Sequence, residues 1–238
     1  MRAAIQPVLF MCLLLHVACR PKTTFDASRL RSIRSIGGAW LLADPAVNQT
    51  RGASTRITER RDLVESVARA HLSYLTTNLS SVWATPMKAA NSAVRTCAYD
   101  GDLFGRQASD LLDDLLPEAP AADAFVIACA DYSFSDSGTG AGLDAVILDR
   151  SGAQVWRFTS GSATHAKGFA PLGGNIGETL LSTISSKQYS DLATRSVLAA
   201  AHQSAYLVVE FLREDLEGKP HSSWGHYRRT WESQQQQR

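Results

Sequence analysis

The sequence has almost no net charge and no apolar run long enough to cross a bilayer. Its 24 Lys and Arg balance 23 Asp and Glu, which leaves a formal net charge of +1. Nucleic-acid-binding domains are usually clearly basic, so this balance argues against nucleic acid as a partner. A membrane-spanning helix needs about 20 consecutive apolar residues, and the apolar run Val8–Leu15 is far shorter. The chain also lacks a Gly-x-Ser-x-Gly elbow and a phosphate loop ending in Gly-Lys-Ser/Thr, and we predict no cofactor and no metal site.

The N-terminus has the three parts of an export leader: a basic start at Arg2, a short apolar stretch and small residues at its end. This end resembles a bacterial lipobox, in which the last residue is a lipidated cysteine. Val17-Ala18-Cys19 matches the last three positions, whereas His16 stands where an aliphatic residue, usually Leu, is expected. The resemblance implies that residues 1–18 are a signal peptide and that Cys19 carries the lipid. Ordinary secretion and an uncleaved leader are the alternatives.

Lipidation of Cys19 would determine where the protein resides. One acyl chain binds a membrane only marginally, whereas the three chains of a lipoprotein cysteine hold the body almost irreversibly. Residue 20 is Arg rather than the Asp that retains such proteins in the enterobacterial inner membrane. The resemblance therefore implies the periplasmic face of the outer membrane in a bacterial cell envelope. Residues 19–32 are polar and basic, and we expect them to be a tether that lifts the folded body off the headgroups.

The remaining chain has the composition of a globular domain, with 45% hydrophobic and 20% charged residues. We expect a single α/β domain over residues 33–213. Residues 214–238 are polar and end in four glutamines, and we expect them to form a disordered tail.

Hydrophobic periodicity predicts the elements of this domain. They are a strand within 33–47, a helix from 58 to a connection that starts at Asn78, a strand over 89–99, a helix over 100–116, a strand over 124–130, strands at 143–148 and 154–159, and a long helix over 189–212. The run Ala124–Ala130 is almost entirely apolar, which is typical of a strand buried on both faces. This strand-helix-strand-helix-three-strand meander-helix order favours an α/β fold, a two-layer sandwich with a mixed sheet.

Part of the pattern resembles periplasmic lipoproteins of the curli-assembly type. The resemblance covers residues 120–160 and rests on Ala121–Ile127, Leu143–Leu148, Asp149-Arg150-Ser151-Gly152 and Val155-Trp156-Arg157. It implies a lipoprotein that assembles or supports an outer-membrane export system.

Two cysteines lie in the body, Cys97 and Cys129. An even number of cysteines in an oxidising compartment favours a disulfide. Closing the loop between these positions would stabilise the fold by roughly 3.5 to 4 kcal/mol. Two buried free thiols are the alternative, because cysteine also packs as a small apolar residue.

Other residues that could carry chemistry lack the partners that the chemistry needs. His221 and His226 are close in sequence, but a zinc site needs three or four ligands. Ser162 lies near His165, but no carboxylate is specified to orient that histidine. The glycine-rich Gly138–Gly142 precedes a predicted strand rather than a helix, so we expect a flexible hairpin connection there instead of a phosphate site.

Two further patterns bear on partners. Asp110, Asp113 and Asp114 lie on the polar side of a predicted helix and are interpreted as a solvated face. Trp224–Trp231 mixes aromatic and basic residues, a composition typical of a partner groove or a headgroup contact. We therefore expect a non-catalytic structural or interaction component of an envelope assembly, which binds the membrane through its anchor and has envelope proteins as partners. A secreted or anchored hydrolase and a small-ligand binding module are the alternatives.

Overall fold

The structure is a computed structural model that describes residues 22–51, 54–83, 88–94, 101–117, 119, 121–135, 138–159, 166–167 and 186–236. The leader, Cys19, Cys97, Ser162 and His165 lie outside these residues, so the fold does not test the predictions made for them.

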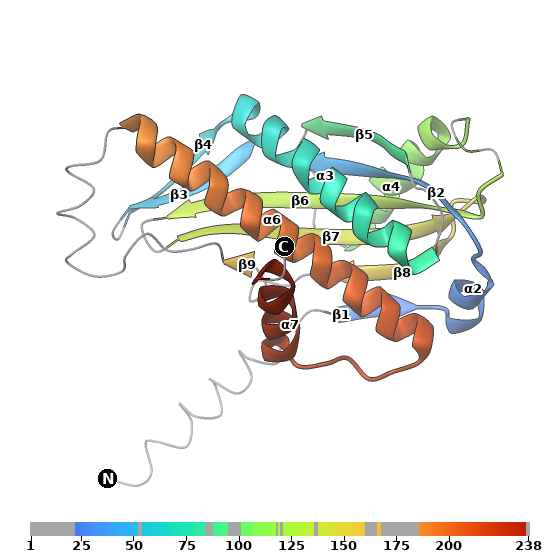
Figure 1. Ribbon diagram of the computed structural model, residues 1–238. Coiled ribbons are helices and arrows are strands. Elements are labelled where there is room, and N and C mark those ends of the chain that lie inside the picture. The colour runs from blue at the N-terminus through green and yellow to red at the C-terminus, as the bar shows by residue number, and fades with distance from the viewer. Residues whose placement is uncertain are drawn as a thin grey trace, which may run out of the picture.

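One mixed sheet organises the described part of the chain (Figure 1). Along the chain the elements are β1 (Lys22–Phe25), α2 (Ala27–Ser32), β2 (Ile36–Ala43), β3 (Ala46–Arg51), β4 (Ser54–Glu59), α3 (Arg61–Trp83), β5 (Lys88–Val94), α4 (Gly101–Leu115), β6 (Ala124–Ser135), β7 (Gly138–Asp149), β8 (Gln154–Thr159), β9 (Ala166–Lys167), α6 (Ser186–Glu217) and α7 (Trp224–Gln236). The main strand order is β1-β8-β7-β6-β2-β5. β2 runs parallel to β5 and β6, whereas the ladders from β6 through β7 and β8 to β1 are antiparallel.

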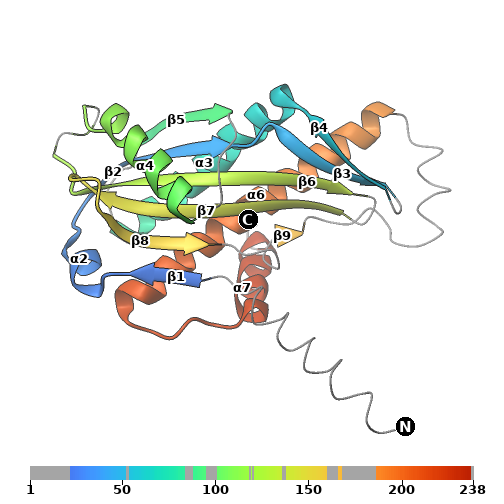
Figure 2. The same ribbon diagram turned by 180° about the vertical axis from the view of Figure 1, so that it is seen from behind.

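Helices cover both faces of this sheet, unequally. α3 and α6 pack side by side across one face, and the shorter α4 lies on the other, as Figures 1 and 2 show from opposite sides. The predicted α/β sandwich with a mixed sheet is confirmed, and α4 adds a partial cover behind it.

The central strand β6 explains why both faces are covered. Ala124, Val126 and Ala128 belong to the core under α3 and α6, whereas Phe125 and Ile127 belong to the core under α4. All five side chains are buried. Successive side chains of a strand point to opposite faces, so an uninterrupted apolar run needs apolar partners on both sides. The prediction of a doubly buried strand here is confirmed.

The hairpin of β6 and β7 is longer than the sequence predicts. The flexible connection expected at Gly138–Gly142 is wrong, because these residues belong to β7 and the ladder continues to the pair Ser135 and Gly138. Glycine contributes no side chain to a sheet, so the period-2 signal disappears while the backbone pairing continues. The predicted turn between β7 and β8 is confirmed, and Gly152 adopts a φ of 80° there.

The predicted end of the first long helix is also wrong, because α3 continues past Asn78 to Trp83. The polar residues that suggested a connection form hydrogen bonds inside the helix instead. The Asn78 amide donates to the Tyr74 carbonyl at 2.8 Å, and the Ser80 hydroxyl donates to the Thr76 carbonyl at 2.8 Å. Side chains that bond back to the preceding turn can remain in a helix. The polar hairpin of β3 and β4 was not predicted at all.

Both ends of the expected domain need correction. The segment 19–32 was expected to be a tether, but its residues from Lys22 onward form β1 and α2, and β1 pairs with β8. The tail from residue 214 was expected to be disordered, but it completes α6 and forms α7. Tyr227 of α7 is 2% exposed and packs on Phe211, with ring centroids 5.1 Å apart. Distant partners stabilise these short polar segments, and no local periodicity reveals such partners.

Gly37 of β2 allows the connection before β6 to approach the sheet closely. A Cβ at this position would lie 2.6 Å from the Cβ atoms of Ala119 and Ala122 and 2.8 Å from Cε1 of Phe125. We expect Gly37→Ala to lower the free energy of unfolding by about 1 to 3 kcal/mol, because the overpacked neighbours must shift. Urea denaturation measures this change. Ser66→Ala, on the exposed side of α3, is the control and should stay within about 0.5 kcal/mol of wild type; equal values for the two variants would contradict the prediction.

Candidate functional site

A cluster of polar side chains lies where α6 ends, beside the sheet edge formed by β8 and β1. The Trp156 indole Nε1 donates to Asp215 Oδ2 at 2.8 Å, and Asp215 Oδ1 lies 2.8 Å from His221 Nε2. Thr23 Oγ1 of β1 lies 3.5 Å from the same His221 nitrogen. Asp215 is 4% exposed, whereas the His221 side chain is 30% exposed. The cluster is thus buried at its carboxylate and open at its imidazole.

The end of α6 brings His221 back onto Asp215. Gly218 has a φ of 68°; its N–H donates to the Asp215 carbonyl, and the Lys219 N–H donates to the Glu214 carbonyl. This pair of bonds is the Schellman motif, which ends a helix on a left-handed residue and reverses the chain. Glycine at 218 therefore sets the direction in which the following residues return.

This cluster holds neighbouring elements together, and its geometry does not allow it to relay a proton. In a hydrolytic triad, one ring nitrogen of the histidine contacts the nucleophile and the other contacts the carboxylate. Here Thr23 and Asp215 both contact Nε2 of His221. The imidazole therefore cannot pass a proton from the hydroxyl to the carboxylate. Asp215 instead joins three elements, because it binds Trp156 of β8 and the residue that leads into α7.

A second set of bonds attaches α7 to α6. The Tyr227 hydroxyl and the Ser222 hydroxyl both donate to the Glu214 carboxylate, the latter at 2.7 Å. Burial, together with the hydrogen bond and the charge of Glu214, raises the pKa of Tyr227 above its ordinary value. The phenol therefore remains protonated and keeps donating across the physiological pH range.

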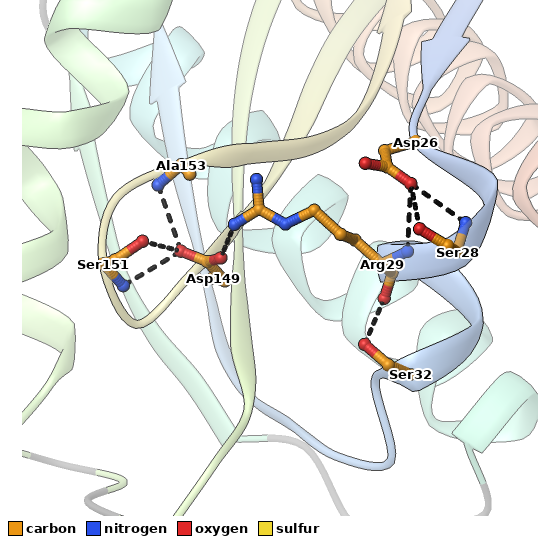
Figure 3. A network of polar contacts seen from close by, with 7 residues as sticks. All are labelled: Asp26, Ser28, Arg29, Ser32, Asp149, Ser151 and Ala153. Carbon is orange, nitrogen blue, oxygen red and sulfur yellow. Dashed lines mark hydrogen bonds and ion pairs between the residues drawn. The ribbon is translucent and has the colours of Figure 1, made fainter.

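A third network joins α2 to the turn between β7 and β8 (Figure 3). Asp149 Oδ1 accepts from the Ser151 N–H at 2.9 Å and from the Ala153 N–H at 3.1 Å, and Oδ2 forms an ion pair with Arg29. Partial burial opposes ionisation, but the bonds from Ser151 and Ala153 and the Arg29 guanidinium hold the pKa of Asp149 below its ordinary value. The Asp-x-x-Gly stretch of the curli-type resemblance thus serves the turn and its contact with α2.

The same network includes the start of α2. Asp26 Oδ1 accepts from the backbone N–H groups of Ser28 at 2.9 Å and Arg29 at 3.1 Å, which makes Asp26 the N-cap of the helix. The hydrogen bonds from Ser28 and Arg29 lower the pKa of Asp26. A capped α2 presents Arg29 to Asp149, as Figure 3 shows.

The core contains a Ser-His-Tyr chain that sequence reasoning missed. Ser204 Oγ of α6 lies 2.9 Å from Nε2 of His71 on α3, and Nδ1 of His71 lies 3.1 Å from the Tyr132 hydroxyl of β6. The Ser204 hydroxyl also donates to the Ala201 carbonyl at 2.9 Å. The three side chains can therefore satisfy one another: in the tautomer that leaves the serine proton on the Ala201 carbonyl, His71 Nε2 donates to Ser204 and Nδ1 accepts from Tyr132.

Burial makes this chain a structural network. A serine nucleophile and its base must be reached by a substrate. All three residues are buried, at 0% for His71, 1% for Tyr132 and 4% for Ser204. Burial, followed by the charge of His202, lowers the pKa of His71 to about 3. His71 follows Val64 and Val67 at helical spacing on the buried side of α3, and that position was the available signal.

The other predicted site residues are scattered over the fold. Cys129 is fully buried in β6; Cys97 lies outside the described residues, so the Cys97–Cys129 pair stays a prediction. His226 is exposed on α7. No group of three potential metal ligands occurs among the described residues. The carboxylates Asp110, Asp113 and Asp114 are exposed on α4.

Comparisons with known proteins leave the family open. No protein-family model and no curated protein matches the chain. One similar solved structure, described only as an uncharacterized protein, shares 10% identity over 76% of this chain and 93% of its own, with a TM-score of 0.38. The C-terminal domain of LpoB from Salmonella enterica shares 11% identity over 55% of this chain and 87% of its own, with a TM-score of 0.17. Both scores are too low to carry an argument. In the described part of the chain, no helix is long and apolar enough to span a membrane.

Proposed function

We propose that this chain is a membrane-anchored extracytoplasmic lipoprotein that acts as a non-catalytic structural or interaction component of an envelope assembly. The observation that carries the proposal is Val17-Ala18-Cys19 at the end of a short apolar leader. The outer membrane, at its periplasmic face, is the proposed location, because residue 20 is Arg rather than Asp.

The polar networks of the described residues support a structural role. Asp215 joins β8 to the residues before α7, Glu214 joins α6 to α7, and Asp149 joins the β7–β8 turn to α2. Each of these carboxylates uses its oxygens to hold two elements together. The hydrolase alternative gains no support from the Ser204–His71 pair, because both side chains are buried and closed to substrate.

Incorporation of radiolabelled palmitate tests the anchor. We expect wild type to carry the label and Cys19→Ser to carry none, because a lipobox directs acylation to its own cysteine. Cys12→Ser is the matched control, since it removes a leader cysteine of the same chemistry and should leave the label unchanged. Label retained on Cys19→Ser, or none on wild type, would overturn the anchored lipoprotein.

The assembly role is tested on the same anchored protein. Purification from detergent-solubilised membranes should recover a partner at a fixed ratio that survives a second purification step. A partnerless monomer from labelled, correctly anchored wild type would contradict the assembly role and leave the anchor intact.

A further inference from the structure

The edge strand β1 has an unusual surface for its position. Phe25 is 41% exposed, and within the described part of the chain it is the one large apolar side chain that stays exposed. Its register partner is Trp156, which is 1% exposed. The apolar surface of the sheet therefore continues from β8 to its edge and remains open there.

The outer side of β1 has no strand partner among the described residues, because β1 pairs with β8 alone. The residues that follow α6 reach this strand at Thr23, whose Oγ1 lies 3.5 Å from His221 Nε2. An open edge is a template for unwanted pairing, and proteins usually cover or charge it. β1 begins with the exposed Lys22, but an exposed Phe25 does not protect an edge against association.

The distance to the proposed anchor is short. Only Arg20 and Pro21 separate Cys19 from Lys22, where β1 begins. An extended chain spans at most about 3.6 Å per residue, so Lys22 must lie within roughly 11 Å of Cys19. The tether expected over residues 19–32 is shorter than predicted, because residues 22–32 belong to β1, α2 and the residue between them. A lipidated Cys19 would therefore hold β1 at the membrane surface.

The charges next to this edge suit anionic lipid. Lys22 is exposed at the start of β1, and Arg31 is exposed in α2, which follows this strand directly. Basic side chains are attracted to an anionic lipid surface. The acidic residue in this segment, Asp26, is occupied as the N-cap of α2.

We infer that the β1 edge, comprising Lys22–Phe25, lies against the phospholipid headgroups of the membrane that holds the Cys19 anchor. This inference rests on the proposed lipoprotein function and adds an orientation to it. Phe25 enters the interfacial region, the basic side chains meet lipid phosphates, and the headgroups cover the open edge of the sheet. α3, which packs on β2 and β5 near the other edge of the sheet, faces away from the membrane (Figure 1).

Photocrosslinking on the full chain in cells tests this orientation. The crosslinker p-benzoylphenylalanine replaces Phe25 in one protein and Ser66 of α3, which is also exposed, in the matched control. Mass spectrometry of the intact proteins separates phospholipid adducts from protein adducts. Palmitate labelling is measured on the same samples. We expect the yield of phospholipid adduct at position 25 to be several-fold higher than at position 66, and to fall to the control level when Cys19→Ser is added.

The outcomes separate the two proposals. Labelled protein with equal lipid adducts at positions 25 and 66 would overturn the orientation and leave the anchor standing. Labelled protein that crosslinks from position 25 to a discrete protein would also overturn it, because the edge would then bind a polypeptide. Absence of palmitate on Cys19 would overturn the lipoprotein function and, with it, the orientation.

Discussion

Replacing Trp156 by alanine should lower the free energy of unfolding by about 3 to 5 kcal/mol, the cost of removing a large aromatic side chain from a packed core. Trp156 is 1% exposed and is among the largest fully buried side chains of the described residues. It packs on Phe158, with ring centroids 6.2 Å apart, and its Nε1 donates to Asp215. Urea unfolding of wild type and variant, followed by circular dichroism, measures the change.

Trp156→Phe separates the hydrogen bond from the packing. This variant keeps an aromatic ring and removes the donor to a buried carboxylate, which should cost about 1 to 3 kcal/mol. Trp40→Phe is the matched control, because Trp40 Nε1 is buried without a hydrogen-bond partner, so its loss leaves no acceptor unpaired. A cycle that combines Trp156→Phe with Asp215→Asn should show coupling of at least about 0.5 kcal/mol. If the two changes in the free energy of unfolding simply add, the hydrogen bond between Asp215 and Trp156 does not stabilise the fold.

The stability of wild type should fall by about 2 kcal/mol between pH 7 and pH 5 relative to His71→Gln. The pKa of His71 is lowered from 6.5 to about 3 by burial, so the folded state stays unprotonated while the unfolded state binds a proton below about pH 6.5. The unfolded state therefore binds more protons throughout this interval, and stability rises with pH. The contribution is complete above pH 6.5 and is lost progressively as the pH falls towards 3.

Glutamine is the informative replacement because it can donate and accept but does not titrate in this range. Denaturant midpoints at several pH values between 5 and 7 measure the difference. Ser66→Ala, which changes an exposed side chain of α3 that does not titrate, should keep the wild-type slope. An equal slope in wild type and His71→Gln would show that His71 gains a proton as easily in the folded chain as in the unfolded one, and that its burial does not hold it neutral.

Local periodicity was sufficient for the central architecture. The apolar run at Ala124–Ala130 and the helical stripes of α3 and α6 are signals within a few turns of chain, and each led to the correct element type. The same method failed at Lys22–Phe25 and at Trp224–Gln236. These segments are polar and become ordered because β8 and α6 provide partners far away in sequence.

The polar networks could not be predicted from the sequence for the same reason. His71 meets Tyr132 and Ser204 across separations of 61 and 133 residues, and Thr23 meets His221 across 198. No motif spacing encodes such contacts. The burial of Ser204 and His71 is likewise a property of the packed fold. A Ser-His pair in the sequence therefore could not have been classed as structural or catalytic.

The sequence by itself determined the doubly buried central strand, the amphipathic long helices and the proposed anchor at Cys19, because hydrophobic runs and linear motifs act over neighbouring residues. Only the tertiary structure decided that β1 and α2 belong to the folded body. That result shortens the link between Cys19 and the sheet to Arg20 and Pro21. The physical reason is that an edge strand forms through backbone hydrogen bonds to a partner that is distant in sequence. The composition of a polar four-residue segment does not predict that partner.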